Sequence, residues 1–250
     1  MTPATPLPLV WTPDILPGFE QTTLVSTPAA DGPIEIVLVR RRVAAGQAAV
    51  LYIHGFIDYF FQTHLADFYG AQGLHFYALD LRRHGRSLRP HQLPNTTADI
   101  DEYLDDVATL NAHEEIDWLL VNGHSTGGLV AALHAHRGAQ RDQVDAVFLN
   151  SPFLDMNIPA WQARLLEPLV AAVGGLLPKL RLPDLSPVYA QSIHADFHGE
   201  WRFDTRWKPI NGFPIYAGWF RAIHRAQDEM ARGLNIDCPC LVLHAERSLR

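Results

Sequence analysis

One short stretch of the chain has the residue types and spacing of a serine nucleophile. The segment VNGHSTGGL, residues 121–129, places Ser125 between Gly123 and Gly127 in the pattern G-x-S-x-G. An apolar run precedes this pattern and an apolar helical stretch follows it, which is the strand–turn–helix setting that exposes such a serine. The two glycines let neighbouring backbone pass closely while the serine takes strained angles. We therefore predict that Ser125 is a nucleophile held above the edge of a sheet.

Acyl transfer through a serine also needs two fixed N–H donors for the negative oxygen of the tetrahedral intermediate. The first candidate is the backbone N–H of Thr126, the residue after the nucleophile. The second is the backbone N–H of Phe56, in the loop His54-Gly55-Phe56 that follows the apolar run AAVLYI. We predict that these two amides form an oxyanion hole beside Ser125.

The elements that must position these residues predict an α/β fold. The chain alternates helical patterns with runs rich in β-branched residues, namely TTLVST, IEIVLVRRRV, AAVLYI, HFYALDL, WLLVNG, DAVFLN and CLVLHA. The later runs are continuously apolar, as buried parallel strands are. Between two of them, Asp99 and Glu102 have the spacing of a capping box ahead of an apolar helical face. This alternation predicts βαβ units and a mostly parallel sheet flanked by helices.

Two segments depart from this alternation of strands and helices. Residues 1–33 are expected to form a proline-rich arm and a first edge strand, because five prolines within residues 1–20 exclude regular structure there. Residues 34–250 then form the α/β domain. Within it, about residues 156–232 carry four of the six tryptophans and predict a helical cap over the edge of the sheet where ligands bind. The alternative is a helical excursion that packs on the sheet and touches no ligand.

Several motifs together resemble the α/β-hydrolase fold, in its monoglyceride lipase and lysophospholipase branch, which is also labelled serine aminopeptidase S33-like. They are LYIHGF, ALDLRRHGRS, NGHSTGGL, FLNSPFLD and CLVLHAE, spread over about residues 34–246. The resemblance implies a serine hydrolase that forms an acyl-enzyme on Ser125 and needs no metal or cofactor. It also implies that a set of residues braces the oxyanion loop without doing chemistry, namely Asp80, Arg82, Gly85 and Ser87.

The expected substrate is a small lipid-like carboxylic ester, such as an acylglycerol or a lysophospholipid. Proline-cleaving relatives carry a Gly-Gly-Ser-Trp-Gly elbow and a His-Gly-Gly-Pro-Gly loop, whereas this chain has GHSTGG and HGFID. Apolar residues beside the oxyanion loop favour an apolar acyl or alcohol site; they are Phe56, Ile57, Tyr59, Phe60 and Phe61. An S33-type aminopeptidase and a non-catalytic binding module of the same fold are the alternatives.

The general base that must activate Ser125 has no clear candidate at the expected position in the sequence. In this fold the catalytic residues follow the order Ser, then Asp or Glu, then His. None of the 13 histidines follows His244. We therefore expect the acid and the histidine to lie beyond Arg250, so that the strand and helix after CLVLHAE are missing and residues 1–250 are a truncated hydrolase. The in-chain alternatives are His224 as base, with Asp155 or Glu246 as acid.

Net charge, the lengths of the apolar runs and the cysteine content limit the partners and the compartment that we expect. The formal net charge of −7 gives no electrostatic reason to expect nucleic acid or an anionic membrane as partner. The longest apolar run, residues 169–177, is too short for stable membrane insertion. Two cysteines, Cys238 and Cys240, neither staple a fold nor supply a metal site, and no secretory signal precedes the domain, so we expect a cytoplasmic protein. The oligomeric state stays open.

Overall fold

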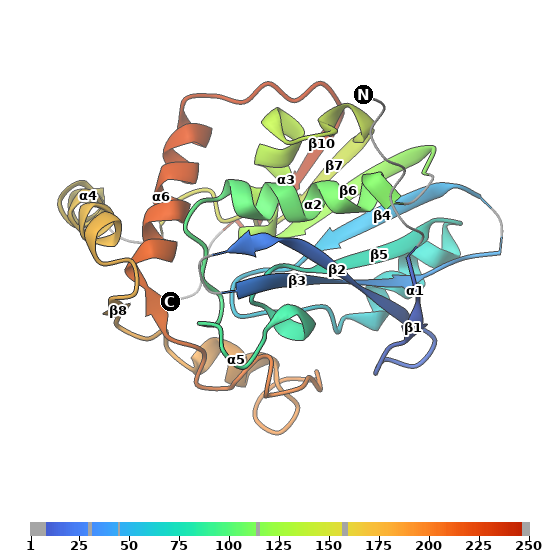
Figure 1. Cartoon of the computed structure of the whole chain (residues 1–250), viewed down its shortest axis with the longest axis horizontal. Helices are drawn as coiled ribbons and strands as arrows, with labels where there is room; N and C mark the ends of the chain where they lie inside the picture. The colour runs from blue at the N-terminus through green and yellow to red at the C-terminus, as the bar shows by residue number, and fades with distance from the viewer. Residues whose placement is uncertain (1–8, 30–31, 45, 114–115, 157–159, 247–250) are drawn as a thin grey trace.

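The computed structural model describes residues 9–29, 32–44, 46–113, 116–156 and 160–246. In this part of the chain one eight-stranded sheet has the order β1-β2-β3-β5-β4-β6-β7-β10 (Figure 1). From β5 to β10 neighbouring strands are parallel, and from β1 to β5 they are antiparallel. The strands are β1 (Thr12–Pro13), β2 (Glu20–Ala29), β3 (Gly32–Arg41), β4 (Ala48–Ile53), β5 (His75–Asp80), β6 (Trp118–His124), β7 (Ala146–Asn150) and β10 (Cys240–Leu243). The predicted mostly parallel sheet is confirmed.

Helices cover both faces of this sheet and form an insert between β7 and β10. The flanking helices are α1 (Thr63–Ala71), α2 (Asp101–His113) and α3 (Thr126–Arg137). We define the insert as residues 160–231; it contains α4 (Ala160–Leu176), β8 (Arg181–Leu182), α5 (Val188–Ile193), β9 (Ile215–Tyr216) and α6 (Ala217–Ala231). Figure 1 shows α4 and α6 together at one end of the sheet. In the described part of the chain, no helix has the length and apolarity that crossing a membrane requires.

The core has two layers because successive side chains of a strand point to opposite faces of the sheet. On one face, Leu51 and Ile53 of β4 pack with α2 and α3 in the larger apolar cluster. On the other face, Val50 and Tyr52 of the same strand pack with Ala66 and Tyr69 of α1. The predicted apolar face lies in the larger cluster and is buried; it consists of Ile100, just before α2, and of Tyr103, Leu104, Val107 and Leu110 within it.

The N-terminal arm departs from the sequence prediction in one respect. Prolines were expected to exclude regular structure from residues 1–20, but Thr12 and Pro13 form β1, the edge strand, which pairs with β2. Proline is tolerated there because an outermost strand does not need every N–H for the ladder. The described arm also touches the sheet at Trp11, whose ring lies 3.7 Å below the Arg40 guanidinium. Residues 1–8 lie outside the described part of the chain.

The start of α2 shows a variant of the predicted capping box. The Asp99 carboxylate accepts a hydrogen bond from the backbone N–H of Asp101 at 3.2 Å, so Asp99 caps the helix. The Glu102 carboxylate does not reach back to Asp99. It accepts instead from the Thr97 hydroxyl at 2.7 Å and from the Arg83 guanidinium at 3.4 Å. Glu102 therefore ties the start of α2 to the loop that follows β5.

At the far edge of the sheet, β10 is the outer strand. It pairs with β7 in parallel over all four of its residues. Its large apolar side chains are exposed in the described structure, with Leu241 at 65% and Leu243 at 56%. The strand is therefore held by its backbone ladder far more than by side-chain packing.

A buried histidine in α3 makes the stability of the fold depend on pH. His134 is 1% exposed, and burial lowers the pKa of its imidazole to about 4. The unfolded chain takes up this proton near the ordinary pKa of 6.5, so the free energy of unfolding falls as the pH drops from 6.5 to 4. At pH 5 the loss assigned to His134 is about 2 kcal/mol.

We predict that His134→Leu removes most of this loss. Urea unfolding at pH 7 and pH 5 measures it, with the exposed His198→Gln as the matched control. An equal fall in stability in the parent protein and in His134→Leu would contradict the prediction.

Candidate active site

Ser125 stands in a strained turn between β6 and α3. Its φ of 54° and ψ of −118° lie in a region that residues with a side chain seldom adopt. The turn is held from β7, because the Ser125 N–H donates to the Asn150 carbonyl at 3.1 Å and the Ser125 carbonyl accepts from the Phe153 N–H at 2.9 Å. The Ser125 residue is half-buried. The structure thus has the sharp strand-to-helix elbow predicted from G-x-S-x-G.

The glycines around Ser125 are required by backbone that passes within contact distance. A Cβ at Gly127 would lie 2.2 Å from the Ile53 carbonyl oxygen, at the end of β4. A Cβ at Gly123 would lie 2.3 Å from the Gly127 carbonyl oxygen. Because backbone atoms cannot move aside as the end of a side chain can, no larger residue fits either position.

The loop after β4 lies directly beside the serine. A Cβ at Gly55 would be 3.2 Å from the Ser125 Cβ, so the loop approaches within van der Waals contact. The next residue is Phe56, whose amide makes no backbone hydrogen bond within the described residues. Thr126 is the first residue of α3, where the N–H has no intrahelical partner. Neither of these two amides has a backbone partner among the described residues, and the oxyanion hole stays a prediction.

His54 holds this loop and is not available as a base. Its Nε2 accepts from the Leu81 N–H at 3.1 Å, which leaves Nδ1–H to donate to the Gly55 carbonyl at 2.7 Å. The His54 ring packs 5.0 Å from the ring of His84, whose pKa burial lowers well below its ordinary value. Both imidazoles are fully buried. The sequence motif HGF pointed to Gly55 and Phe56 but gave no sign of this role of His54.

Asp80, at the end of β5, braces the same loop. Its carboxylate accepts from the Phe60 N–H at 2.9 Å and from the Arg86 N–H and guanidinium at 2.9 and 3.0 Å. Ser87 links this corner to β3, because its hydroxyl donates to the Asp80 carbonyl at 2.5 Å and accepts from the Val37 N–H at 2.8 Å. These contacts match the bracing role that the resemblance implied for Asp80 and Ser87.

The arginine that braces this loop is Arg86 and not Arg82. The Arg82 guanidinium binds the buried Asp106 carboxylate of α2, at 2.9 Å from Nε and 2.5 Å from Nη2. Arg86 is the residue that reaches the loop, with Nη1 3.0 Å from the Phe60 carbonyl. Asp14 of the N-terminal arm pairs with Arg86 from the other side at 2.7 Å. The assignment of Arg82 is therefore corrected to Arg86, since the side chains of 82 and 86 leave the turn toward different layers.

The structure does not bring the in-chain candidates for base and acid against Ser125. Among the described residues, no hydrogen bond joins the Ser125 hydroxyl to a histidine or a carboxylate. His224 lies 3.6 Å from Asp228, one turn further along α6. The exposed Asp155 carboxylate accepts from the Met156 N–H, and Glu246 is exposed after β10.

His124 is the ring next to the serine in sequence, and among the described residues no hydrogen bond joins it to the Ser125 hydroxyl. A Cβ at Gly55 would lie 3.4 Å from its Nδ1, which places the ring against the loop after β4. Burial lowers the pKa of His124 below its ordinary value, so the ring is neutral at pH 7. It packs the elbow against the loop.

The insert covers the loops on both sides of Ser125. The Trp219 indole of α6 stacks on the Phe56 ring, with centroids 3.9 Å apart and planes at 24°. Further along α6, the Gln227 side-chain amide donates to the Phe153 carbonyl at 3.1 Å. Both Trp219 and Gln227 are buried. Aromatic side chains of the insert and of the core thus meet beside the elbow.

Comparison with known proteins agrees with this geometry. The family model described as serine aminopeptidase, S33, matches residues 44–248. The chain belongs to this family. Its fold is that of the α/β hydrolases, as the resemblance of its motifs indicated.

Solved structures share the fold at low sequence identity. A monoglyceride lipase from Saccharomyces cerevisiae is 15% identical, with a TM-score of 0.63 over 89% of this chain and 76% of that one. A lipase in its open form is 17% identical, with a TM-score of 0.65 over 89% and 79% of the two chains. The epoxide hydrolase CorEH is 17% identical, with a TM-score of 0.55 over 89% and 81%. No curated protein matches the chain.

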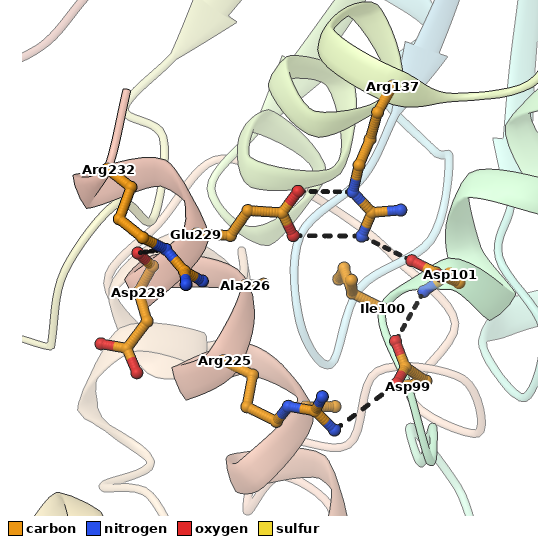
Figure 2. Close-up of a pocket in the computed structure, with 10 residues that line it drawn as sticks. Asp99, Ile100, Asp101, Arg137, Arg225, Ala226, Asp228, Glu229 and Arg232 are labelled. Carbon is orange, nitrogen blue, oxygen red and sulfur yellow. Dashed lines mark hydrogen bonds and ion pairs between the residues drawn. The ribbon is translucent and has the colours of Figure 1, made fainter. Parts of the chain in front are cut away.

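A cavity with a charged lining lies away from Ser125. A cavity of about 380 Å³ lies between α6, the start of α2 and the end of α3 (Figure 2). The Arg137 guanidinium binds Glu229 in two places, at 2.5 and 3.1 Å, and Asp101 at 2.6 Å. Arg225 lies 3.8 Å from Asp99. These ion pairs join the insert to the two core helices, and the charged lining does not suit an acyl chain.

The described residues contain no group of three or more His, Cys, Asp or Glu side chains arranged to hold a metal ion.

The distance from each glycine to its neighbours predicts how much an alanine at that position lowers the free energy of unfolding. Gly127→Ala should lower the free energy of unfolding by about 3 kcal/mol, because its Cβ meets backbone at 2.2 Å. Gly55→Ala, at 3.2 Å from a side-chain carbon, should cost about 1 kcal/mol. Gly70→Ala in α1 has ordinary contact at 3.7 Å and is the matched control. Urea denaturation of the three variants gives the ranking, and a Gly127→Ala protein as stable as Gly70→Ala would refute it.

Proposed function

We propose that this protein is a serine hydrolase that cleaves small, lipid-like carboxylic esters. The observation that carries the proposal is the strained Ser125 elbow, with the Gly55 loop in van der Waals contact with it. A nucleophile needs access to substrate and a neighbouring site for developing negative charge, and we propose that the elbow and the Gly55 loop provide them. Membership in the serine aminopeptidase S33 family is consistent with a nucleophilic serine.

In this mechanism the Ser125 Oγ attacks the ester carbonyl carbon while a general base takes the hydroxyl proton. The carbonyl oxygen becomes negative and receives hydrogen bonds from the Phe56 and Thr126 amides. Collapse of this intermediate expels the alcohol, which takes a proton, and leaves an acyl group on Ser125. Water then attacks the acyl-enzyme, releases the carboxylic acid and returns the proton to Ser125.

An ester substrate fits the surroundings of Ser125 better than a peptide. The stacked Phe56 and Trp219 rings give the site an aromatic wall that suits an acyl chain. We therefore propose that the insert is a cap that lines the acyl site. The S33-type aminopeptidase is the alternative, and cleavage of aminoacyl p-nitroanilides without cleavage of esters would replace the ester proposal.

The first test is Ser125→Ala in the natural protein. Hydrolysis of a short p-nitrophenyl ester should fall at least about a thousandfold, because the acyl-enzyme can no longer form. The parent protein should take up one fluorophosphonate label, and the variant none. Activity within tenfold of the parent would remove Ser125 from the mechanism. If the parent binds the ester without hydrolysing it, the protein is a binding module of the same fold.

The second test concerns the proposed cap. Trp219→Ala removes the ring that stacks on Phe56, so it should change the ratio of kcat/KM between long and short acyl esters more than tenfold, while each retains measurable turnover. Trp118→Ala, at the start of β6 and the opposite end of the sheet, is the matched control. The side chain of Trp161 lies outside the part of the chain that the structure describes. Equal losses on both esters would mean that the insert only packs on the sheet.

A further inference from the structure

We infer that Lys208, in the insert, positions the oxyanion loop and thereby controls the turnover rate; this inference rests on the proposed function. Lys208 and Asp58 are 3% and 4% exposed, although each carries a charge. The Lys208 ammonium donates to the Asp58 carboxylate at 2.9 Å and to the Ile57 carbonyl at 3.4 Å. Asp58 and Ile57 belong to the loop HGFID, directly after Phe56.

The backbone at Ile57 explains why the loop needs an external contact. Its φ is 50°, which is a strained conformation for a residue branched at Cβ. Such a conformation persists only where the surroundings hold it. The Lys208 ammonium lies against the Ile57 carbonyl, and a Cβ at Gly212 would lie 3.5 Å from the Ile57 Cδ1. The insert therefore contacts the strained residue through both its backbone and its side chain.

Neighbouring contacts extend this attachment along the loop. The Asp204 N–H donates to the Tyr59 hydroxyl at 2.6 Å, and the Trp207 ring packs edge-on to Tyr59 at 5.2 Å. The Lys208 ammonium also lies 5.9 Å from the Phe61 ring. One segment of the insert, residues 203–212, thus follows the loop from Ile57 to Phe61.

Stability alone does not account for this buried pair. An apolar pair of similar volume can stabilise a protein as well as a buried ion pair does, since burial of charge has a desolvation cost. A charged pair differs because it fixes the orientation of both side chains, since the carboxylate and the ammonium must meet at hydrogen-bond distance. Here that orientation sets the path of the backbone next to the Phe56 N–H. A displacement of about 1 Å at such a donor can lower the rate about a hundredfold.

The test separates positioning from folding by removing the charges singly and together. Lys208→Met leaves the Asp58 carboxylate buried without its partner, so it should lower both Tm and kcat. The double variant Asp58→Asn with Lys208→Met removes both charges at nearly the same volume and should recover most of the Tm. Its kcat for the p-nitrophenyl ester should stay about 10- to 100-fold below the parent, with KM within about threefold.

A readout specific to the oxyanion hole accompanies the rates. An enzyme that binds the oxyanion through N–H groups prefers an ester to its thionoester, because sulfur is the poorer acceptor. The ratio of kcat/KM for the ester to that for its thionoester should fall in the double variant. Arg202→Met is the matched control, since the exposed Arg202 guanidinium pairs with the exposed Asp196 at 2.9 Å, outside residues 203–212, and its loss should leave this ratio unchanged.

Recovery of both Tm and kcat in the double variant, or an unchanged ratio, would overturn the inference and leave the pair a structural one. Absence of Ser125-dependent hydrolysis in the parent would instead overturn the proposed function, and this inference with it. The two failures are therefore distinguishable.

Discussion

The architecture around Ser125 depends on one steric constraint, which is the contact of glycine backbone at the ends of the parallel strands β4 and β6. Gly127 at the start of α3 lies against the carbonyl at the end of β4, and Gly123 at the end of β6 lies against Gly127. The helix can begin directly at the sheet only because these positions carry no side chain. That close start forces the single residue between strand and helix into its positive φ. The exposure of the serine is thus a geometric result of packing on its neighbours.

The loop beside the serine is held from two sides by different kinds of interaction. On the core side, Asp80, Arg86 and His54 bind its backbone through buried hydrogen bonds, and His54 does so as a neutral ring. On the insert side, Lys208 binds Asp58, and Trp219 stacks on Phe56. Because polar groups without partners are costly inside a protein, each buried charge has an opposite charge close by. A shift of the insert would therefore move the loop HGFID, whose Gly55 lies beside Ser125.

Sequence reasoning recovered the parts that local patterns encode. Apolar runs placed the strands, the spacing of Ile100 to Leu110 placed the buried side of α2, and G-x-S-x-G placed the elbow. It missed the contacts that depend on distant partners. Lys208 and Asp58 are 150 positions apart, and neither sits in a recognisable pattern. In RRHGRS only the backbone path of the turn decides that Arg86 faces the loop and Arg82 faces α2. The catalytic acid and histidine, as well as the substrate, remain predictions.

The strained backbone at Ser125 has a consequence for laboratory evolution of this protein. A positive φ on a residue with a Cβ costs the folded state about 1–3 kcal/mol, and glycine relieves it. A selection that rewards heat resistance alone would therefore favour glycine at position 125, which removes the hydroxyl of the proposed nucleophile. A gain in thermal stability and the loss of the proposed nucleophile would then occur in the same variant. A selection that requires both catalytic turnover and a high melting temperature would retain serine at position 125.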